Sequence, residues 1–350
     1  MPLWLKILIT LVLIPLAALL LVIVFATVTD FRPPQKLTVY QANGKADTLP
    51  DSSAFRLLIW NIGYGGLDSQ MDFFYDGGTK VRTPKVRLEE NLAGLEKFLA
   101  GVDSVDFTLL QEVDVSSKRS YHVDEVRRFT GAPEDRFAYY GKNYDVFFVP
   151  VPVAHPMGSV NSGVLSLSRT RPSEVSRISF PGQYGWPKRL FMLDRCFLVM
   201  RFPVSHGKEL LVINTHNEAY DNGSIRDQQM AYLKKFLQGE YQSGNYLVVA
   251  GDWNQCPPDF KPAFTGEIFD TIDYKGVESD FMPSGWKWVF DNTVPSNRRL
   301  DAGYEKGKTR TTVIDFFLLS PNLRSLGCRT TDLGFAWSDH QPVQIKFALQ

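Results

Sequence analysis

Side chains able to bind a metal or move a proton stand directly after short apolar runs at several points in this sequence of 350 residues. The apolar runs predict buried strands, and a group at the end of a strand is held rigidly enough for catalysis. A single polar residue in such a place is ordinarily a turn former, whereas the repetition along one chain indicates a shared site. These residues are Asn61, Gln111, Glu112, His216, Asp252 and Asn254.

Glu112 and Asn61 have the chemistry of ligands for a hard divalent cation. Mg²⁺ prefers oxygen ligands, typically one or two carboxylates with several waters retained. Glu112 would supply a carboxylate and Asn61 an amide oxygen, although Glu112 read alone would be a surface glutamate that opens a loop. The pair predicts a site for Mg²⁺, with Mn²⁺ as the alternative ion.

The run Gly251-Asp252-Trp253-Asn254 places a carboxylate and an amide two residues apart, so both point to the same side of an extended segment. The glycine allows a close approach of the backbone. Such a pair can orient and deprotonate a water for attack on phosphorus, or hold a metal. Read alone, the run makes an ordinary Asx turn.

Asp315 begins a later apolar run, and Ser338-Asp339-His340 precedes the last one. A carboxylate paired with a histidine fixes the tautomer of the ring and raises its basicity. His340 read alone would be a structural histidine in a turn. Beside the other acidic clusters, it is a candidate catalytic residue.

Cationic residues near these clusters could clamp a second phosphate or an anionic headgroup. Arg119 lies in the segment after Glu112, and Arg298 and Arg310 precede Asp315. Each could equally belong to a solvated basic face. Aromatic runs could wall an apolar groove or touch lipid, although such residues more often belong to the core. These runs are Phe73-Phe74-Tyr75, Phe147-Phe148 and Trp286-Lys287-Trp288.

The elements that must position these residues are short strands interleaved with amphipathic helices. Their interleaving predicts an α+β fold in layers around two packed sheets. The expected helices cover residues 86–100 and 226–237. The expected strands cover residues 55–60, 107–110, 163–167, 197–200, 210–213, 246–250, 314–319 and 343–347.

Composition narrows the function classes. Lys and Arg together number 38 and Asp and Glu also 38, so no global basic field draws the protein onto nucleic acid. Cys196, Cys256 and Cys328 are too few and too scattered for a disulfide framework or a zinc site. A chain of 350 residues suits one large domain with an appendage.

The N-terminus predicts a membrane anchor. Residues 7–28 contain no charged side chain, and as a helix they span roughly 30 Å, enough to cross a bilayer. The run is longer than a usual signal-peptide core, which favours an uncleaved anchor over residues 1–29. The alternative is a signal peptide cleaved after the small residues Val24 and Ala26. Lys6 before the run favours a single-pass protein with a cytoplasmic N-terminus and an extracytoplasmic domain.

Residues 30–53 are polar and contain proline, which predicts a stalk between the anchor and the rest of the chain. Residues 54–350 would then form the catalytic domain. We expect a monomer.

In their order along the chain, the chemical motifs resemble those of the endonuclease/exonuclease/phosphatase superfamily. This family includes exonuclease III-like repair nucleases, pancreatic deoxyribonuclease, neutral sphingomyelinases and inositol polyphosphate 5-phosphatases. The resemblance covers nearly everything from Phe55 to Phe347 and implies a four-layer α/β/β/α sandwich with the site at one end of the paired sheets. The matching segments are Trp60-Asn61-Ile62, Leu110-Gln111-Glu112-Val113, Asn161-Ser162-Gly163, Asn214-Thr215-His216, Gly251-Asp252-Trp253-Asn254, Ile314-Asp315 and Ser338-Asp339-His340-Gln341-Pro342-Val343.

The resemblance also implies roles for individual residues. Glu112 would be the principal metal ligand, helped by Asn61 and Asp339. Asp252 would orient or activate the attacking water, and Asn254 would contact the phosphate. Asn161, in one of the matching segments, is a further candidate for substrate binding.

The two histidines receive roles from the same resemblance. Asp315 would pair with His340, which would bind and polarise a phosphoryl oxygen or act as a base. His216 stands where deoxyribonuclease-like and sphingomyelinase-like members carry a histidine, and there it would stabilise or protonate the leaving oxygen. Gly63 stands where repair nucleases often have an aspartate, which, like His216, points away from those nucleases.

The sequence therefore predicts a Mg²⁺-dependent hydrolase that directs an activated water in line at a phosphoester. The favoured substrate is a phosphodiester near the membrane, such as a lipid headgroup. An endonuclease or exonuclease acting on DNA or RNA is the alternative. A non-catalytic phosphate- or lipid-binding membrane protein is a further alternative.

Overall fold

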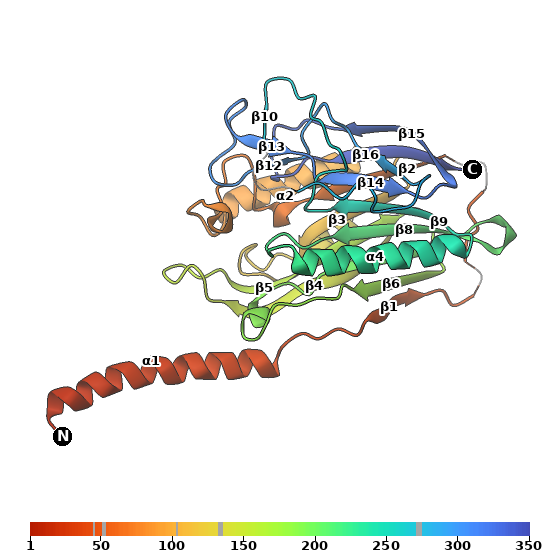
Figure 1. The fold of residues 1–350 in the computed structure, drawn as a ribbon. Helices are drawn as coiled ribbons and strands as arrows, with labels where there is room; N and C mark the ends of the chain where they lie inside the picture. The colour runs from red at the N-terminus through yellow and green to blue at the C-terminus, as the bar shows by residue number, and fades with distance from the viewer. Residues whose placement is uncertain (45, 51–53, 103, 132–135, 271–274) are drawn as a thin grey trace.

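The computed structural model describes residues 1–44, 46–50, 54–102, 104–131, 136–270 and 275–350 (Figure 1). Two mixed sheets pack face to face and helices cover their outer faces, which confirms the expected four-layer α/β/β/α sandwich. The α-helices are α1 (Leu3–Val28), α2 (Lys85–Ala100), α3 (Glu125–Thr130) and α4 (Ser224–Gln242). Single 3₁₀ turns are η1 (Gly63–Gly65), η2 (Phe74–Asp76), η3 (Lys188–Phe191) and η4 (Ser205–Gly207).

One sheet has seven strands in the order β1-β6-β7-β8-β9-β14-β11. Strands β8 and β9 are parallel, and their neighbours in this sheet pair antiparallel. Helix α4 packs its apolar stripe on the outer face. The strands are β1 (Lys36–Gln41), β6 (Glu174–Ser179), β7 (Cys196–Pro203), β8 (Glu209–His216), β9 (Tyr246–Asp252), β14 (Asp315–Leu319) and β11 (Lys287–Val289).

The other large sheet has six strands in the order β15-β16-β2-β3-β5-β4, with β2 and β3 parallel. Helix α2 covers its outer face through leucines at helical spacing. Its strands are β15 (Leu323–Thr330), β16 (Val343–Leu349), β2 (Ala54–Asn61), β3 (Phe107–Asp114), β5 (Gly158–Ser168) and β4 (Phe137–Val149). Three short strands form a small separate sheet: β10 (Ile268–Phe269), β13 (Arg310–Thr312) and β12 (Asn297–Arg298).

The main core lies between the two large sheets. Leu57 and Ile59 of β2 pack there with Val212 of β8 and Val248 of β9, all fully buried. The alternate residues of the same strands face the helices, so the central strands are buried on both faces. The expected strands and helices are confirmed, and the parallel pairs β2–β3 and β8–β9 hold their carboxyl ends rigidly at one end of the sandwich.

Helix α1 is long and apolar enough to cross a membrane. A signal sequence near the N-terminus can have the same length and composition. The segment after it departs from the expected stalk. Residues 36–41 form β1, which pairs antiparallel with β6 at the edge of the seven-stranded sheet. This part of residues 30–53 therefore belongs to the sheet, because its extended β-branched and aromatic residues complete an open edge. Residues 45 and 51–53 lie outside the described residues.

Candidate active site

Strand register places three of the expected site residues side by side at one end of the seven-stranded sheet. His216 of β8 lies opposite Asp252 of β9, and Asp252 lies opposite Asp315 of β14. All three are almost completely buried. The apolar strands behind these residues fix their positions, so their side chains converge without needing loop closure.

Gly251 is required by the close approach of β8 and β9. Its φ is +144°, and a Cβ atom at this position would lie 2.0 Å from the carbonyl oxygen of Thr215. No L side chain fits there. The glycine lets Asp252 and His216 sit at the same level on neighbouring strands.

The run that follows Gly251 alternates as expected from the sequence. The ring of Trp253 faces the outer core, where it stacks on Phe316 at 5.1 Å. Asp252 and Asn254 face the opposite side and line a cavity. The side chain of Asn254 donates to the carbonyl oxygen of Asn217 at 2.9 Å, and its own N–H donates to Asp252 Oδ1 at 2.9 Å. The segment thus holds the Asp252 carboxylate in one orientation.

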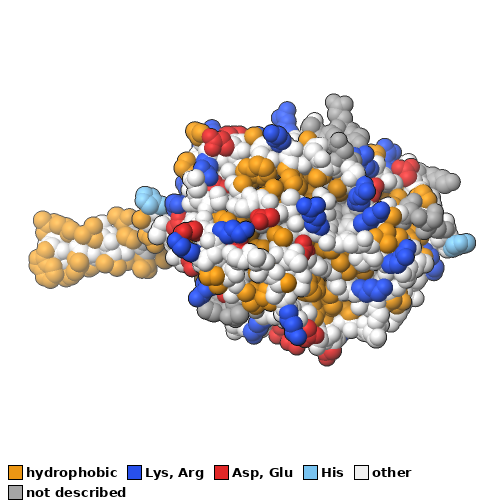
Figure 2. All heavy atoms as spheres, turned by 90° about the horizontal axis from the view of Figure 1, so that it is seen from above, with side chains coloured by type: hydrophobic (Ala, Val, Ile, Leu, Met, Phe, Trp, Pro, Cys, Tyr) orange, Lys and Arg blue, Asp and Glu red, His pale blue; other side chains and the backbone are white. Residues whose placement is uncertain are grey.

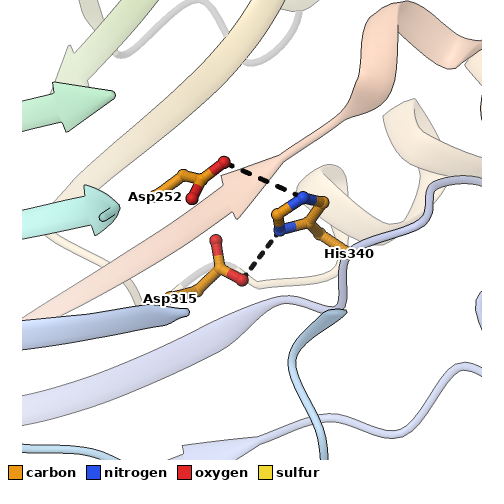
Figure 3. A group of neighbouring side chains, drawn as sticks. All are labelled: Asp252, Asp315 and His340. Atoms are coloured by element: carbon orange, nitrogen blue, oxygen red, sulfur yellow. Dashed lines mark hydrogen bonds and ion pairs between the residues drawn. The ribbon is translucent and has the colours of Figure 1, made fainter. Parts of the chain in front are cut away.

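Asp252, Asp315 and His340 form a compact group, here called the His340 cluster (Figure 3). Nδ1 of His340 donates to Asp315 Oδ2 at 2.8 Å, since the carboxylate can only accept. Ser296 Oγ donates to the same oxygen at 2.7 Å. Nε2 of His340 then faces Asp252 Oδ2 at 3.8 Å. Asp315 therefore fixes the ring with Nε2 directed at the remaining carboxylate.

Charge in the His340 cluster is compensated within the protein. Burial alone would lower the pKa of His340, but Asp315, Asp339 and Asp252 outweigh it and raise this pKa to about 10. Burial raises the pKa of Asp252, and the charge of His340 opposes that effect. A protonated His340 is the counter-charge for the carboxylates around it.

Asn61, Glu112 and Asp339 form a second group, here called the Glu112 cluster. Glu112 sits at a register shift of β3 against β5, between Leu110 and Val113, with a φ of 53°. The bulge turns its carboxylate toward the cavity, which it lines together with Asp339. Asn61 Nδ2 donates to Glu112 Oε1 at 3.1 Å and to Asp252 Oδ2 at 3.0 Å.

Both polar atoms of the Asn61 amide have hydrogen-bond partners in the protein. Its oxygen accepts from the N–H of Gly63 at 3.0 Å, and its nitrogen bridges the two clusters. In this arrangement Asn61 positions Glu112 and Asp252. Gly63 stands at the position where repair nucleases often have an aspartate. An aspartate has little room there, because a Cβ atom would lie 3.0 Å from Asp339 Oδ1.

The Glu112 cluster has the donor set for a divalent cation. Burial raises the pKa of Asp339 to about 7; the charge of His340 opposes this, the charge of Glu112 adds to it, and Arg298 opposes it again. Two carboxylates with this mutual repulsion fit a cation between them. Asp252, Asp315 and His340 also lie close enough to hold an ion. The hydrogen bond between His340 Nδ1 and Asp315 Oδ2 occupies one atom of each of these two residues.

His216 lies beside the His340 cluster, with Nε2 3.5 Å from Asp252 Oδ2. Burial lowers the pKa of His216 well below 6.5, and the charge of Arg195 adds to this. The ring is therefore neutral at neutral pH. Its buried Nδ1 has no hydrogen-bond partner among the described residues. A neutral His216 ring can donate a hydrogen bond to a ligand oxygen. This favours stabilisation of that oxygen over its protonation by His216 in the imidazolium form.

Both clusters open into one cavity of about 740 Å³. Its far wall carries residues that the sequence did not single out, among them Asn143, Lys188 and Arg195. Arg195 is almost completely buried, its Nε and Nη1 make no hydrogen bond to the described residues, and its Nε lies 3.6 Å from Glu218 Oε2. No motif surrounds Arg195, so only its place at the start of β7 could have indicated it. Asn297, whose amide nitrogen lies 3.0 Å from His340 Nε2, was missed for the same reason.

The residues expected to bind substrate have different positions. Arg119 lines the cavity, but its guanidinium donates to Asp114 and Ser162 and stacks on the Tyr64 ring at 3.7 Å. Arg298 also lines it, while its guanidinium is bound by backbone carbonyl oxygens, including that of Met71. These two arginines hold the walls of the cavity in place.

Asn161 and Arg310 are not brought to the cavity. Arg310 is exposed at the start of β13, where its backbone pairs with β10. Asn161 is half-buried in β5, and its backbone bonds to Ser117 and Val115. The spacing along the sequence could not reveal this, because it places each residue near site residues without giving the direction of its side chain.

Comparisons with known proteins agree with this architecture. A model of the Endonuclease/Exonuclease/phosphatase family matches residues 58–340. An endonuclease/exonuclease/phosphatase from Beutenbergia cavernae is similar, with 15% identity, a TM-score of 0.53, and coverage of 85% of this chain and 72% of that one. TDP2 of D. rerio, solved with a single-strand DNA product, has 15% identity and a TM-score of 0.53, covering 84% of this chain and 99% of that one. A protein of the same description from Bacteroides vulgatus has 13% identity and a TM-score of 0.52, covering 85% and 100%. A search of curated proteins gives no match.

Proposed function

The chain belongs to the endonuclease/exonuclease/phosphatase family, and on this premise we propose that it is a metal-dependent hydrolase of a phosphodiester near a membrane. The convergence of Asp252, His340 and Glu112 on one cavity, with Asp315 hydrogen-bonded to His340, carries the proposal. The family name covers enzymes that cleave phosphoester bonds. A cavity of about 740 Å³ is large enough for a headgroup-sized ligand.

The His340 cluster would activate the water and neutralise charge. Asp252 would orient the water, since its carboxylate is fixed by Asn61 and by the N–H of Asn254. His340, whose ring Asp315 fixes, would bind a nonbridging phosphoryl oxygen through Nε2. Neutral His216 would donate to the leaving oxygen, and Asn254 would contact the phosphate.

Glu112 and Asp339 would hold the divalent cation, with Asn61 positioning Glu112. A bound Mg²⁺, or Mn²⁺ in its place, would supply Lewis-acid stabilisation of charge on the phosphoryl oxygens. The raised pKa of the buried Asp339 carboxyl near Glu112 supports the proposal. Residues 54–350, with β1 added to their sheet, would be the catalytic domain, acting as a monomer.

Helix α1 would anchor the protein in a membrane as a single span, with the catalytic domain outside the cytoplasm. The absence of charge over residues 7–28 supports a span, and Lys6 before it supports this orientation. Reporter fusions after Pro50 should be active only outside the cytoplasm. A fusion active in the cytoplasm overturns the orientation, and a mature protein lacking residues 1–26 identifies α1 as a signal peptide.

The purified full chain should hydrolyse bis-p-nitrophenyl phosphate when Mg²⁺ is present and lose that activity in EDTA. A parallel screen of DNA, RNA, sphingomyelin-like lipids and inositol phosphates identifies the natural class. The zero net charge supports lipid over nucleic acid. Cleavage of DNA at equal rates with and without lipid would favour the nuclease alternative. If the folded protein turns over no phosphoester, a non-catalytic binding protein is the remaining alternative.

A further inference from the structure

Four apolar side chains are exposed together beside the cavity, on two loops of the domain. Their exposed fractions are 38% for Phe147, 37% for Val151, 89% for Val153 and 58% for Trp186. Phe147 and the two valines belong to the end of β4 and the β4–β5 connection, and Trp186 belongs to the β6–β7 connection. We call these four residues the apolar rim. Exposing such large apolar side chains to water is unfavourable unless they meet a partner.

The apolar rim borders the cavity. The β4–β5 connection also carries Met157, and the β6–β7 connection also carries Lys188, Met192 and Leu193, all of which line the cavity. The same two loops therefore present apolar side chains outward and build the cavity wall inward. A surface that covers the rim would lie next to the cavity.

The end of α1 reaches the domain at this rim. The ring of Phe25 packs edge-on against Phe147, with centroids 4.6 Å apart. Nε1 of Trp186 donates to Thr27 Oγ1 at 3.2 Å. The next contact along the chain is polar, between Asp30 and Arg189 at 3.8 Å. The apolar helix thus gives way to charged residues at the level of the rim, as a membrane span does at the bilayer surface.

Helix α1 also projects from the end of the sandwich that holds the site. Strand β16 runs toward the C-terminus, and β2 is antiparallel to it, so Asn61 lies at the end of the sandwich away from the C-terminus. Figure 1 shows α1 leaving the domain on that side, opposite the point marked C. In Figure 2 the projecting segment is almost entirely hydrophobic. A bilayer crossed by α1 would face the end of the sandwich that carries the two clusters.

Charge at the rim suits the same partner. Lys188 and Arg189 follow closely after Trp186, and the Lys188 ammonium lies 3.8 Å from the centre of the Tyr184 ring. Aromatic residues beside lysine and arginine are typical of the headgroup region, where the rings lie at the interface and the cations meet phosphates. A protein partner would not need to lie at the end of an apolar helix.

We propose that the apolar rim docks on the phospholipid surface that α1 enters, so that the cavity opens onto lipid headgroups. The substrate would then be the phosphodiester of a lipid in the same membrane. This statement about the substrate rests on the proposed hydrolase function. The docking itself rests only on the rim and α1.

The docking is tested with the full chain in phospholipid nanodiscs, carrying an environment-sensitive fluorophore on a single introduced cysteine. Cys196 and Cys256 are buried, so Cys328→Ser removes the half-buried thiol. The test variant is Val153→Cys. The matched control is Leu326→Cys, 40% exposed on β15, at the sheet edge opposite β4.

The label at position 153 should shift to shorter emission wavelengths in nanodiscs and be quenched by lipid-borne quenchers, whereas the label at 326 should change in neither way. Equal behaviour of the two labels overturns the proposal and leaves a protein as the occupant of the rim.

Activity separates docking from chemistry. Val153→Asp combined with Trp186→Ser should lower the hydrolysis of a vesicle phosphodiester by about tenfold, and leave turnover of bis-p-nitrophenyl phosphate unchanged. Leu326→Asp should change neither rate. If the label at position 153 inserts into the bilayer but the protein hydrolyses no phosphoester, the docking stands and the proposed hydrolase function is overturned. An unchanged rate on vesicles in the double variant overturns the link between docking and substrate.

Discussion

The His340 cluster and the Glu112 cluster are neighbours joined by Asn61, yet they treat charge in opposite ways. In the first, His340 balances the carboxylates of Asp252 and Asp315. In the second, the carboxylate of Asp339 is buried beside Glu112, and its pKa rises to about 7. The first cluster is balanced by its own histidine, and we propose that a cation completes the second.

The difference separates two kinds of requirement. A self-compensated cluster keeps its geometry in the free protein and can be ready for catalysis. An under-compensated one costs stability until its ion binds, and that cost makes the site selective for cations. We expect substitutions in the first cluster to remove turnover, and substitutions in the second to change metal dependence and stability.

Asp252→Asn should have the largest effect, because it keeps the shape of the side chain but removes the carboxylate that we propose orients the water. Turnover of bis-p-nitrophenyl phosphate should fall by about 1,000-fold or more, roughly 4 kcal/mol of barrier. The measurement is kcat at saturating Mg²⁺, with the melting temperature as a check on folding. If Asp252→Asn keeps more than about a tenth of the activity, the His340 cluster is not the centre of the chemistry.

Glu112→Gln should act on the metal rather than on the chemistry. The Mg²⁺ concentration for half-maximal activity should rise by about 10- to 100-fold, with partial recovery at high Mg²⁺ or Mn²⁺. Titration of activity with each ion measures this. Glu90→Gln, an exposed glutamate of α2, is the matched control and should titrate as the wild type. An unchanged Mg²⁺ titration in Glu112→Gln would place the ion elsewhere.

Arg195→Lys tests whether the far wall of the cavity binds substrate. Lysine keeps a charge opposite Glu218 but loses the planar set of donors. KM should rise by about tenfold, the size of one charge-assisted hydrogen bond, with little change in kcat. Arg310→Lys, at an exposed position outside the cavity, should change neither constant. The opposite result would restore Arg310 as a substrate-binding residue.

Asp339→Asn should have the smallest effect, and on stability without metal. The folded-state pKa of Asp339, about 7, lies above that of an unfolded aspartate, so the proton stabilises the fold at low pH. That contribution is complete below about pH 4 and is lost as the pH rises through 7.

In EDTA at pH 8, Asp339→Asn should therefore melt a few degrees above wild type, about 2–4 °C for each 1 kcal/mol. At pH 4 the two melting temperatures should agree. Calorimetry at both values checks the sign, and a variant that melts lower at pH 8 would show that Asp339 is already compensated.

The sequence predicts the fold, and which residues end the central strands, because these signals are local. Apolar runs define the buried strands that end at Asn61, His216 and Asp252, and the chemistry follows each run directly. Strand β1 was expected as part of a stalk, because an edge strand with a mixed pattern shows no burial in its sequence. Strand β4 gives no clear run either, since glycine, lysine and asparagine interrupt it.

The far wall could not be predicted for a different reason. Arg195 and Asn143 meet only because the backbone of Asp194 donates to the carbonyl oxygen of Asn143, across a long separation in sequence. Arg119 and Arg298 have the residue type expected of a phosphate clamp. Their partners, Asp114 and the backbone carbonyl oxygens, are visible only in the folded chain.

Strand β1 has a consequence for kinetics. Only residues 29–35 separate the end of α1 from the first residue of β1, and a fully extended chain of that length spans at most about 25 Å. Once α1 is in a bilayer, the domain is tethered to the bilayer and cannot diffuse into bulk solvent. Encounters with a lipid substrate then depend on its surface density rather than on its bulk concentration. The rate of encounter with a freely dissolved substrate is not raised by this tether.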